Sequence, residues 1–230
     1  MKALVFDTSS IITLSLNNLL YILPELKQRF SGQFFITEAV RKEIIDNPMH
    51  SRKFKLEALQ IQQLILDGTI EIYGQSIEKQ TQQLLDLSNQ IFKTSGNYIK
   101  LVDKAEVEAL ALANLLQAVY VVDERTMRML VEDAEGLREI FQRKLHTTVA
   151  IDKNKLQELQ KVVKVNIIRS SEIATAAYSL GILSKLTRKD HLSNENLKEQ
   201  LLDGLLWGLK LNGCSISEQE IKEIEKIEGF

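Results

Sequence analysis

The chain has 230 residues, of which 44% are apolar and 26% are charged, and its 29 basic residues nearly balance 31 acidic ones. This composition is that of an ordinary globular protein, and it excludes a disordered or collagen-like chain. A net charge of -2 excludes a uniformly basic surface, although residues 125–191 carry 13 basic and 8 acidic residues. The single cysteine, Cys214, excludes an internal disulfide, and no apolar run reaches the roughly 20 residues of a membrane span. We therefore expect a cytoplasmic protein outside the membrane.

Short apolar runs alternate along the chain with longer stretches of helical periodicity, which is the pattern of a parallel sheet covered by helices. The expected strands are Ala3–Phe6, Phe34–Ile36, Ile70–Tyr73, Tyr120–Val122 and Val165–Ile168. The segments between them place apolar residues three and four positions apart, which predicts helices. The expected fold is therefore α/β, with three layers (α/β/α) around a short parallel sheet of about five strands.

The last part of the chain predicts helices without further strands. Ser193–Leu211 and Ser217–Ile227 both have helical periodicity, and the second opens with a capping box. No linker rich in Pro, Gly or Ser marks a boundary earlier in the chain. We therefore expect one domain with helical insertions over residues 1–186, followed by a C-terminal helical extension over residues 187–230.

Acidic residues stand at the ends of two expected strands. Asp7 follows the first strand and Asp123 follows the fourth. Ligands of open parallel sheets bind beyond the carboxyl ends of the strands, where the strand order reverses, so both carboxylates are expected in one crevice. Glu106 opens the helix before the fourth strand, and Glu43 lies in the helix after the second. Such a carboxylate set without His or Cys favours Mg²⁺ or Mn²⁺, which activate water and neutralise phosphate charge.

Each of these acids also has a purely structural interpretation. Asp7 and Asp123 both precede helices, and either one alone is better explained as an N-cap. Taken together with a first-turn glutamate, they favour a metal site. Asp103 competes with Glu106 for its role because the two share a helical turn, and Glu124 is a further acid that can join the site.

The order of these residues resembles that of the PIN-domain nucleases, including the VapC-like ribonucleases. The matching segments are Asp7-Thr-Ser9, Glu43 in VRKEI, Glu106 in AEVEALALA and Asp123 in VVDERTMR. The resemblance extends through the last expected strand and its helix. It implies a Mg²⁺- or Mn²⁺-dependent ribonuclease with Asp7, Glu43, Glu106 and Asp123 as catalytic acids. Asp7, Glu106 and Asp123 would hold the metal, and Ser9 would orient Asp7.

The resemblance also implies a substrate, single-stranded RNA. Arg125 and Arg128, three positions apart on the helix after the fourth strand, would contact its phosphates. The alternative for Arg128 is an ion pair with Glu132, four residues further on. Ser170 or Ser171 lies where the family places a small hydroxyl residue, and Ser170 would bind the substrate.

Longer excursions over residues 60–102 and 127–161 distinguish this chain from compact members of the family, and the second is expected to be helical. Partners beyond RNA are an antitoxin, a protein of an RNA-processing complex or a second copy of the chain. Trp207 would anchor such a dimer or pack within its own domain. The alternative function is that of a catalytically inactive PIN-like binding module in an RNA-processing or regulatory complex.

Overall fold

The computed structural model describes residues 2–187 and 197–230, and it confirms the α/β/α fold with a parallel five-stranded sheet. The strand order is β3-β2-β1-β6-β8, so the order reverses between β1 and β6. The strands are β1 (Ala3–Phe6), β2 (Gln33–Ile36), β3 (Glu71–Ile72), β6 (Val119–Val121) and β8 (Ile167–Ile168). Residues 188–196, which include the start of the expected helix Ser193–Leu211, lie outside the described residues.

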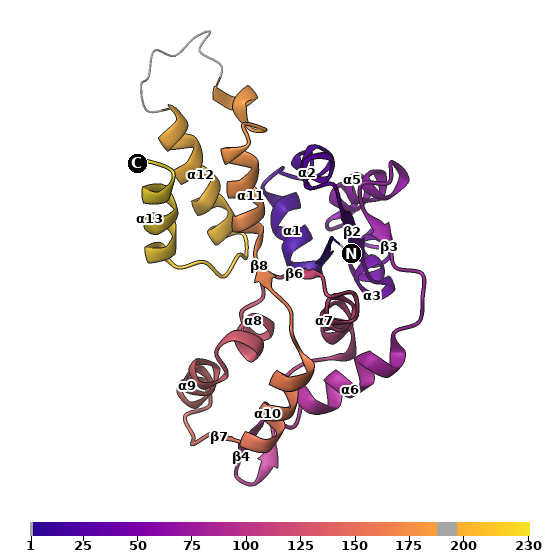
Figure 1. Ribbon diagram of the computed structural model, residues 1–230, viewed down its shortest axis with the longest axis vertical. Helices are drawn as coiled ribbons and strands as arrows, with labels where there is room; N and C mark the ends of the chain where they lie inside the picture. Colours follow the sequence, from indigo (N-terminus) through magenta and orange to yellow (C-terminus); the bar gives the residue numbers. More distant parts are fainter. Residues whose placement is uncertain (1, 188–196) are drawn as a thin grey trace.

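Helices cover both faces of this sheet, which explains why its strands are apolar throughout (Figure 1). One face packs against α1 (Thr8–Leu16), α2 (Ile22–Phe30) and α11 (Ser170–Ser179). On this face Phe34 of β2 contacts Phe6 of β1 at 5.4 Å and Phe30 of α2 at 5.8 Å between ring centroids. The opposite face packs against α7 (Lys104–Leu116), whose Leu110 is fully buried. Side chains alternate between faces along a strand, so position in a strand decides which helix a residue meets.

The chain between β2 and β3 is helical and contains an irregular turn. Its elements are α3 (Glu38–Arg41), the π-helix η1 (Lys42–Asp46), α4 (Asn47–Met49) and α5 (Lys55–Leu66). Thr37 caps α3 through its side chain, which accepts a hydrogen bond from Val40 N. Single π-helical turns inside helices are rare and occur often at functional sites, and this one contains Glu43.

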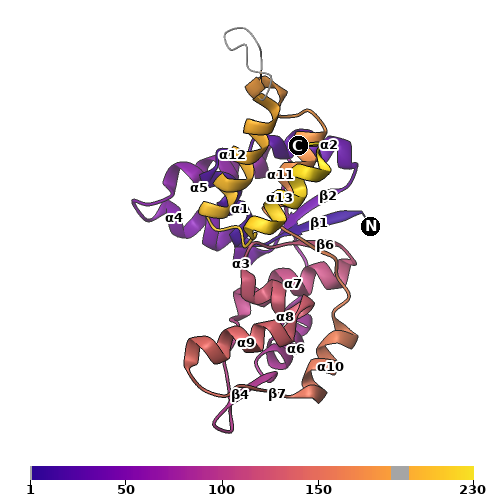
Figure 2. The ribbon, with the colours of Figure 1, turned by 90° about the vertical axis from the view of Figure 1, so that its left-hand side faces the viewer.

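The two excursions along the chain fold together into a second lobe beside the main sheet (Figures 1 and 2). Its helices are α6 (Glu78–Ser88), α8 (Arg125–Glu132), α9 (Ala134–Leu145) and α10 (Lys153–Val162). It also holds an antiparallel sheet of order β5-β4-β7, made of β4 (Phe92–Thr94), β5 (Asn97–Tyr98) and β7 (Ala150–Ile151). The expected helical stretch over residues 127–161 is formed by α8, α9 and α10, and β7 interrupts it. Phe92 and Phe141 meet edge to face at the centre of this lobe, 5.5 Å apart.

The first C-terminal helix lies against α11, and the second packs against the first (Figure 1). After the short 3₁₀ turn η2 (Ser184–Thr187) they are α12 (Leu197–Leu211) and α13 (Glu218–Ile227). Leu202, Leu206 and Leu209 of α12 are completely buried, and Trp207 packs against the same core. In the part of the chain that the structure describes, no helix is long and apolar enough to cross a membrane.

Candidate active site

Asp7 occupies the end of the central strand, beside the reversal of strand order. Its side chain caps α1 and accepts hydrogen bonds from Ser9 N at 2.9 Å and Ser9 Oγ at 2.6 Å. The residue is only 8% exposed. Burial raises the pKa of Asp7 from 3.8 to about 6, the charge of Glu43 adds to this rise, and the bonds from Ser9 oppose it. Among the described residues no Lys, Arg or His pairs with Asp7, so its carboxylate has no counter-charge, which suits a ligand of a cation.

Ser9 connects Asp7 to the end of the neighbouring strand. While its hydroxyl donates to Asp7, the same oxygen accepts hydrogen bonds from Asp123 N at 3.0 Å and Glu124 N at 3.3 Å. Asp7 N in turn donates to Val121 O at 2.9 Å, which extends the pairing of β1 with β6. The Ser9 hydroxyl is therefore fully used inside the protein, and it fixes the carboxylate of Asp7 relative to residues 123 and 124.

Asp123 lies close to Asp7 along the backbone, but its side chain points to the other face of the sheet. It is fully buried and accepts hydrogen bonds from Ser170 N at 2.7 Å and Ser170 Oγ at 2.6 Å, at the start of α11. This follows from strand alternation, because Phe6 pairs with Val121 and so places Asp7 beside Val122. The structure therefore brings the two backbones together without bringing the two carboxylates together.

The surroundings of the Tyr120 hydroxyl show which acids lie on the same face of the sheet as Asp7. Its ring is fully buried beneath α7, and its hydroxyl has no hydrogen-bond partner among the described residues. Burial raises the pKa of Tyr120 well above its usual value, and the charges of Asp7, Glu124 and Glu106 raise it further. The acids around this hydroxyl are therefore Asp7, Glu106 and Glu124. The sequence offers one signal for Tyr120, a single aromatic residue in the otherwise aliphatic run before Asp123.

The three glutamates near Asp7 each hold a local hydrogen bond in this structure. Glu106 accepts from Asp103 N at 2.6 Å in a capping box, and Glu124 accepts from Met127 N at 2.7 Å as the N-cap of α8. Glu43 accepts from Thr8 Oγ1 at 2.5 Å. As placed, no three acidic, histidine or cysteine side chains within residues 2–187 and 197–230 form a group that could hold a metal ion.

The chemistry of the donors nevertheless fits a hard divalent cation. All of the groups around Asp7 are oxygen donors, which suit Mg²⁺ or Mn²⁺ better than zinc. A hydrated cation held by Asp7 would compensate its charge and would offer the hydroxyl of Tyr120 a hydrogen-bond partner. Cys214 offers no competing thiolate, because burial raises the pKa of its thiol to about 11.

The expected substrate-binding residues have different surroundings. Arg125 is exposed at the start of α8, and no ion pair to it is found in the described part of the chain. Arg128 pairs with Glu132 at 3.2 Å, as the spacing of four predicts in the alternative interpretation. Ser170 is fully buried and donates to Asp123, so in this structure it positions Asp123 and is not accessible to a substrate. Arg125 is the one of the three that is free to meet a phosphate.

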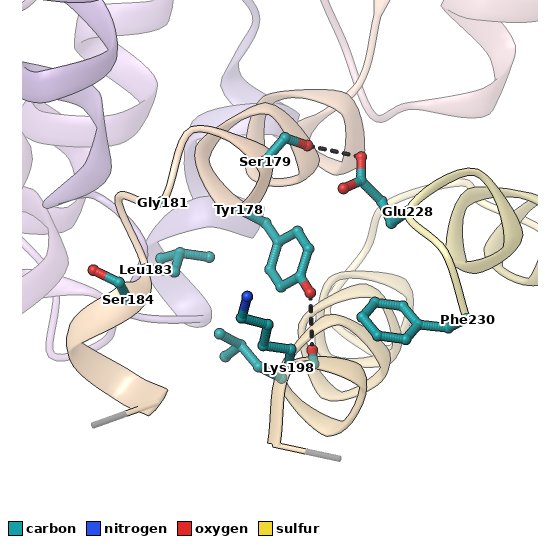
Figure 3. Close-up of a pocket in the computed structure, with 9 residues that line it drawn as sticks. Tyr178, Ser179, Gly181, Leu183, Ser184, Lys198, Glu228 and Phe230 are labelled. Carbon is teal, nitrogen blue, oxygen red and sulfur yellow. Dashed lines mark hydrogen bonds between the residues drawn. The ribbon is translucent and has the colours of Figure 1, made fainter. Parts of the chain in front are cut away.

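A separate cavity lies at the far end of α11 (Figure 3). It measures about 340 Å³ and is lined by residues of α11, α12 and the last residues of the chain. Tyr178 donates there to Lys198 O at 3.2 Å, and Ser179 donates to Glu228 at 2.7 Å. Eight residues of helix separate Tyr178 from Ser170, a rise of about 12 Å. This cavity is therefore not part of the acidic edge around Asp7.

Comparison with known proteins identifies the family of the chain. A family model for a PIN domain (DUF3368) matches residues 3–140, which run from β1 into α9 and include Asp7, Glu43, Glu106 and Asp123. No curated protein and no solved structure matches the chain. The match covers more than half of the chain, and PIN domains are generally nucleases. The protein belongs to the PIN-domain family, with β8, α11 and the C-terminal helices lying beyond the matched segment.

Proposed function

We propose that the protein is an endoribonuclease that hydrolyses single-stranded RNA with the aid of Mg²⁺ or Mn²⁺. The observation that carries this proposal is the buried, uncompensated carboxylate of Asp7 at the strand reversal of a PIN-domain sheet. The charge of Glu43 acts on Asp7, and the charges of Asp7, Glu106 and Glu124 all act on the buried hydroxyl of Tyr120. An acidic edge of this kind attracts cations and serves the phosphodiester chemistry for which the family is known.

In this proposal Asp7 and Glu106 hold the cation, and Glu124 supplies the third carboxylate. When bound, the cation supplies charge neutralisation at the phosphate and lowers the pKa of water. The sequence predicts Asp123 as a ligand, but both of its oxygens bond Ser170, so we assign it the positioning of α11 against β6. Ser9 orients Asp7, Glu43 adds negative charge beside it, and Arg125 contacts a flanking phosphate.

Substitution of Asp7 tests the proposal. We expect Asp7→Asn to reduce Mn²⁺-dependent cleavage of a labelled single-stranded RNA at least about 100-fold, because it removes the central charge. Asp86→Asn, at an exposed position on α6, is the matched control and should cleave like the wild type. Cleavage is followed on denaturing gels with and without a chelator. Equal activity of Asp7→Asn and the wild type would contradict the proposal.

A catalytically inactive binding module is the second candidate. It is favoured by the local capping bonds of Glu106 and Glu124, which a structural role explains fully. Titration calorimetry with Mn²⁺ separates the two candidates. If the protein is a nuclease, it should bind Mn²⁺, and Glu124→Gln should weaken this binding more than Asp123→Asn does. If it is an inactive module, Asp7→Asn should leave any Mn²⁺ binding unchanged.

The narrower proposal is a VapC-like toxin or an RNA-processing enzyme. A toxin requires an antitoxin that blocks the acidic edge. Inhibition of the purified nuclease by the product of an adjacent gene supports the toxin, whereas cleavage of defined precursor RNAs without such an inhibitor supports processing.

A further inference from the structure

A second cavity opens beside the acidic edge, at the carboxyl ends of β2 and β3. Its volume is about 180 Å³. Thr37 follows β2 directly, Tyr73 follows β3 directly, and Glu108 comes from α7, two residues after Glu106. Adjacent strands lie about 4.8 Å apart, so the cavity is one to two strand spacings, roughly 5–10 Å, from the end of β1. That distance places it beside the site of Asp7, where a neighbouring nucleotide of a bound strand would lie.

Tyr73 gives this cavity a rigid aromatic wall. Its ring is half-buried and contacts Phe35 edge to face, with 5.9 Å between the ring centroids. Its hydroxyl donates to Gln75 Oε1 at 3.2 Å. A ring held at both ends is a suitable surface for an unpaired nucleobase, since proteins bind single-stranded RNA largely by stacking bases on aromatic side chains.

The charge of the cavity wall excludes a phosphate. The wall contains Glu38, Glu78 and Glu108 and no Lys, Arg or His. Glu38 is paired with Arg41 at 2.6 Å, and Glu78 is paired with Lys104 at 2.6 Å. Within the described residues Glu108 has no such pair. A half-buried carboxylate without a cation favours a neutral ligand that donates hydrogen bonds.

Glu108 offers a hydrogen-bond acceptor to a base edge. The Glu108 carboxylate accepts only a long bond, 3.4 Å, from Ala39 N. Thr37 is fully buried, and its hydroxyl oxygen accepts from Val40 N, so it shapes the wall and offers no group to a ligand. The cavity thus presents one weakly engaged acceptor, the carboxylate of Glu108.

We propose that this cavity binds one unpaired nucleobase of the RNA substrate and prefers a base with an exocyclic amino group over uracil. Glu108 accepts from the amino group, as carboxylates do from cytosine N4, and the base stacks on Tyr73. The volume corresponds to about six liquid waters, which suits one base and excludes a base pair. This inference rests on the proposed function in taking single-stranded RNA as the ligand.

Binding measurements in the Asp7→Asn background test the subsite without cleavage. The probes are fluorescent oligouridines, either unmodified or with a single adenine, cytosine or guanine, and binding is measured by anisotropy. We expect about tenfold tighter binding of the substituted oligonucleotides, in line with the discrimination of one good base contact. Glu108→Gln should reduce this preference to less than about twofold. Glu139→Gln, at an exposed position on α9, is the charge-matched control and should keep it.

Tyr73 provides a second, independent variant. Tyr73→Ala should weaken binding of all four oligonucleotides about tenfold, because it removes stacking, and Tyr73→Phe should not. The subsite would be overturned if Asp7→Asn, with its cavity intact, bound all four oligonucleotides equally. An unchanged base preference after the further substitution Glu108→Gln would also overturn it. Cleavage by the wild type without any base preference overturns the subsite alone. If the wild type binds with a base preference but never cleaves RNA, the proposed nuclease function is contradicted and the proposed subsite is not.

Discussion

At the scale of single residues, the protein separates two aspartates that sequence analysis expected side by side. Asp7 and Asp123 follow neighbouring strands, yet they lie on opposite faces because the register pairs Phe6 with Val121. Both carboxylate oxygens of Asp123 accept hydrogen bonds from Ser170, whereas no basic side chain among the described residues pairs with Asp7. The two aspartates thus have different roles, since Asp123 holds the structure together and Asp7 contributes negative charge. The pKa of Asp7 makes this difference measurable.

The stability of the metal-free protein should report the burial of Asp7. Its folded pKa, about 6, lies above its usual 3.8, so stability is lost as pH rises through this window. Two pKa units correspond to about 3 kcal/mol. We expect Asp7→Asn to have the stability of the wild type near pH 3.8 and to exceed it by up to about 3 kcal/mol at pH 7. Urea unfolding in a chelator across this range provides the measurement, and a difference that does not change with pH would contradict the assigned burial.

At the scale of elements, α13 is attached to α11 by a partly buried ion-pair network. Arg169, 9% exposed, bonds Glu172 at 2.6 Å and Glu220 of α13 at 2.8 Å. Burial opposes the charge of Glu220, but hydrogen bonds from Ser217 and Arg169 outweigh it and hold its pKa at about 2. The network therefore couples the start of the last helix to the edge of the sheet at β8.

Glu220→Gln should loosen α13. Because the glutamate is about a third exposed, we expect a loss of only about 1–2 kcal/mol at pH 7, below the cost of a fully buried pair. A depressed pKa stabilises above the usual value of 4.5, so the difference from the wild type should shrink as pH falls from 4.5 toward 2. Glu218→Gln in the same turn is the control. Hydrogen exchange of the α13 amides follows the effect, and equal protection in both variants would argue against the coupling.

Periodicity predicted the main sheet but not the small one. Each of the five parallel strands lies within the expected run or overlaps it, because strands covered on both sides are continuously apolar. β4 and β7 are three and two residues long, and their pairing joins Phe92 to Ile151 across the sequence. Runs this short carry no period, and their partners are set by tertiary packing. The roles of Tyr120 and Ser170 could not be predicted from the sequence either, because the face and the register of a residue are properties of the folded sheet.

At the scale of the whole molecule, the C-terminal helices are part of the packing around the acidic edge. The turn after α12 places Ser215 N on Asp123 O at 3.3 Å, and Ser215 O accepts from Arg169 at 3.2 Å. The boundary between residues 1–186 and 187–230 stays a prediction, but α12 covers α11 with three fully buried leucines. The stability of the nuclease domain should therefore depend on these helices.

Truncation provides the test. A chain ending at Thr187 exposes the apolar face of α11, where Ala174 and Ala177 are completely buried. Loss of three buried leucines alone costs roughly 2–5 kcal/mol each, so we expect this chain to be unfolded or aggregated at 25 °C. A chain ending at Ser217, which lacks only α13, should fold with reduced stability. Calorimetric melting checks both, and a cooperative transition of residues 1–187 at the temperature of the full chain would contradict the expectation.

The strand order also determines when the acidic edge can form during synthesis. β1 carries Asp7 and leaves the ribosome first, yet its neighbour β6 ends more than a hundred residues later, and Ser215 closes the contact with Asp123 later still. Contacts of such high sequence separation form late, and domains assemble as units during translation. The acidic edge is therefore incomplete until more than half of the chain has been synthesised.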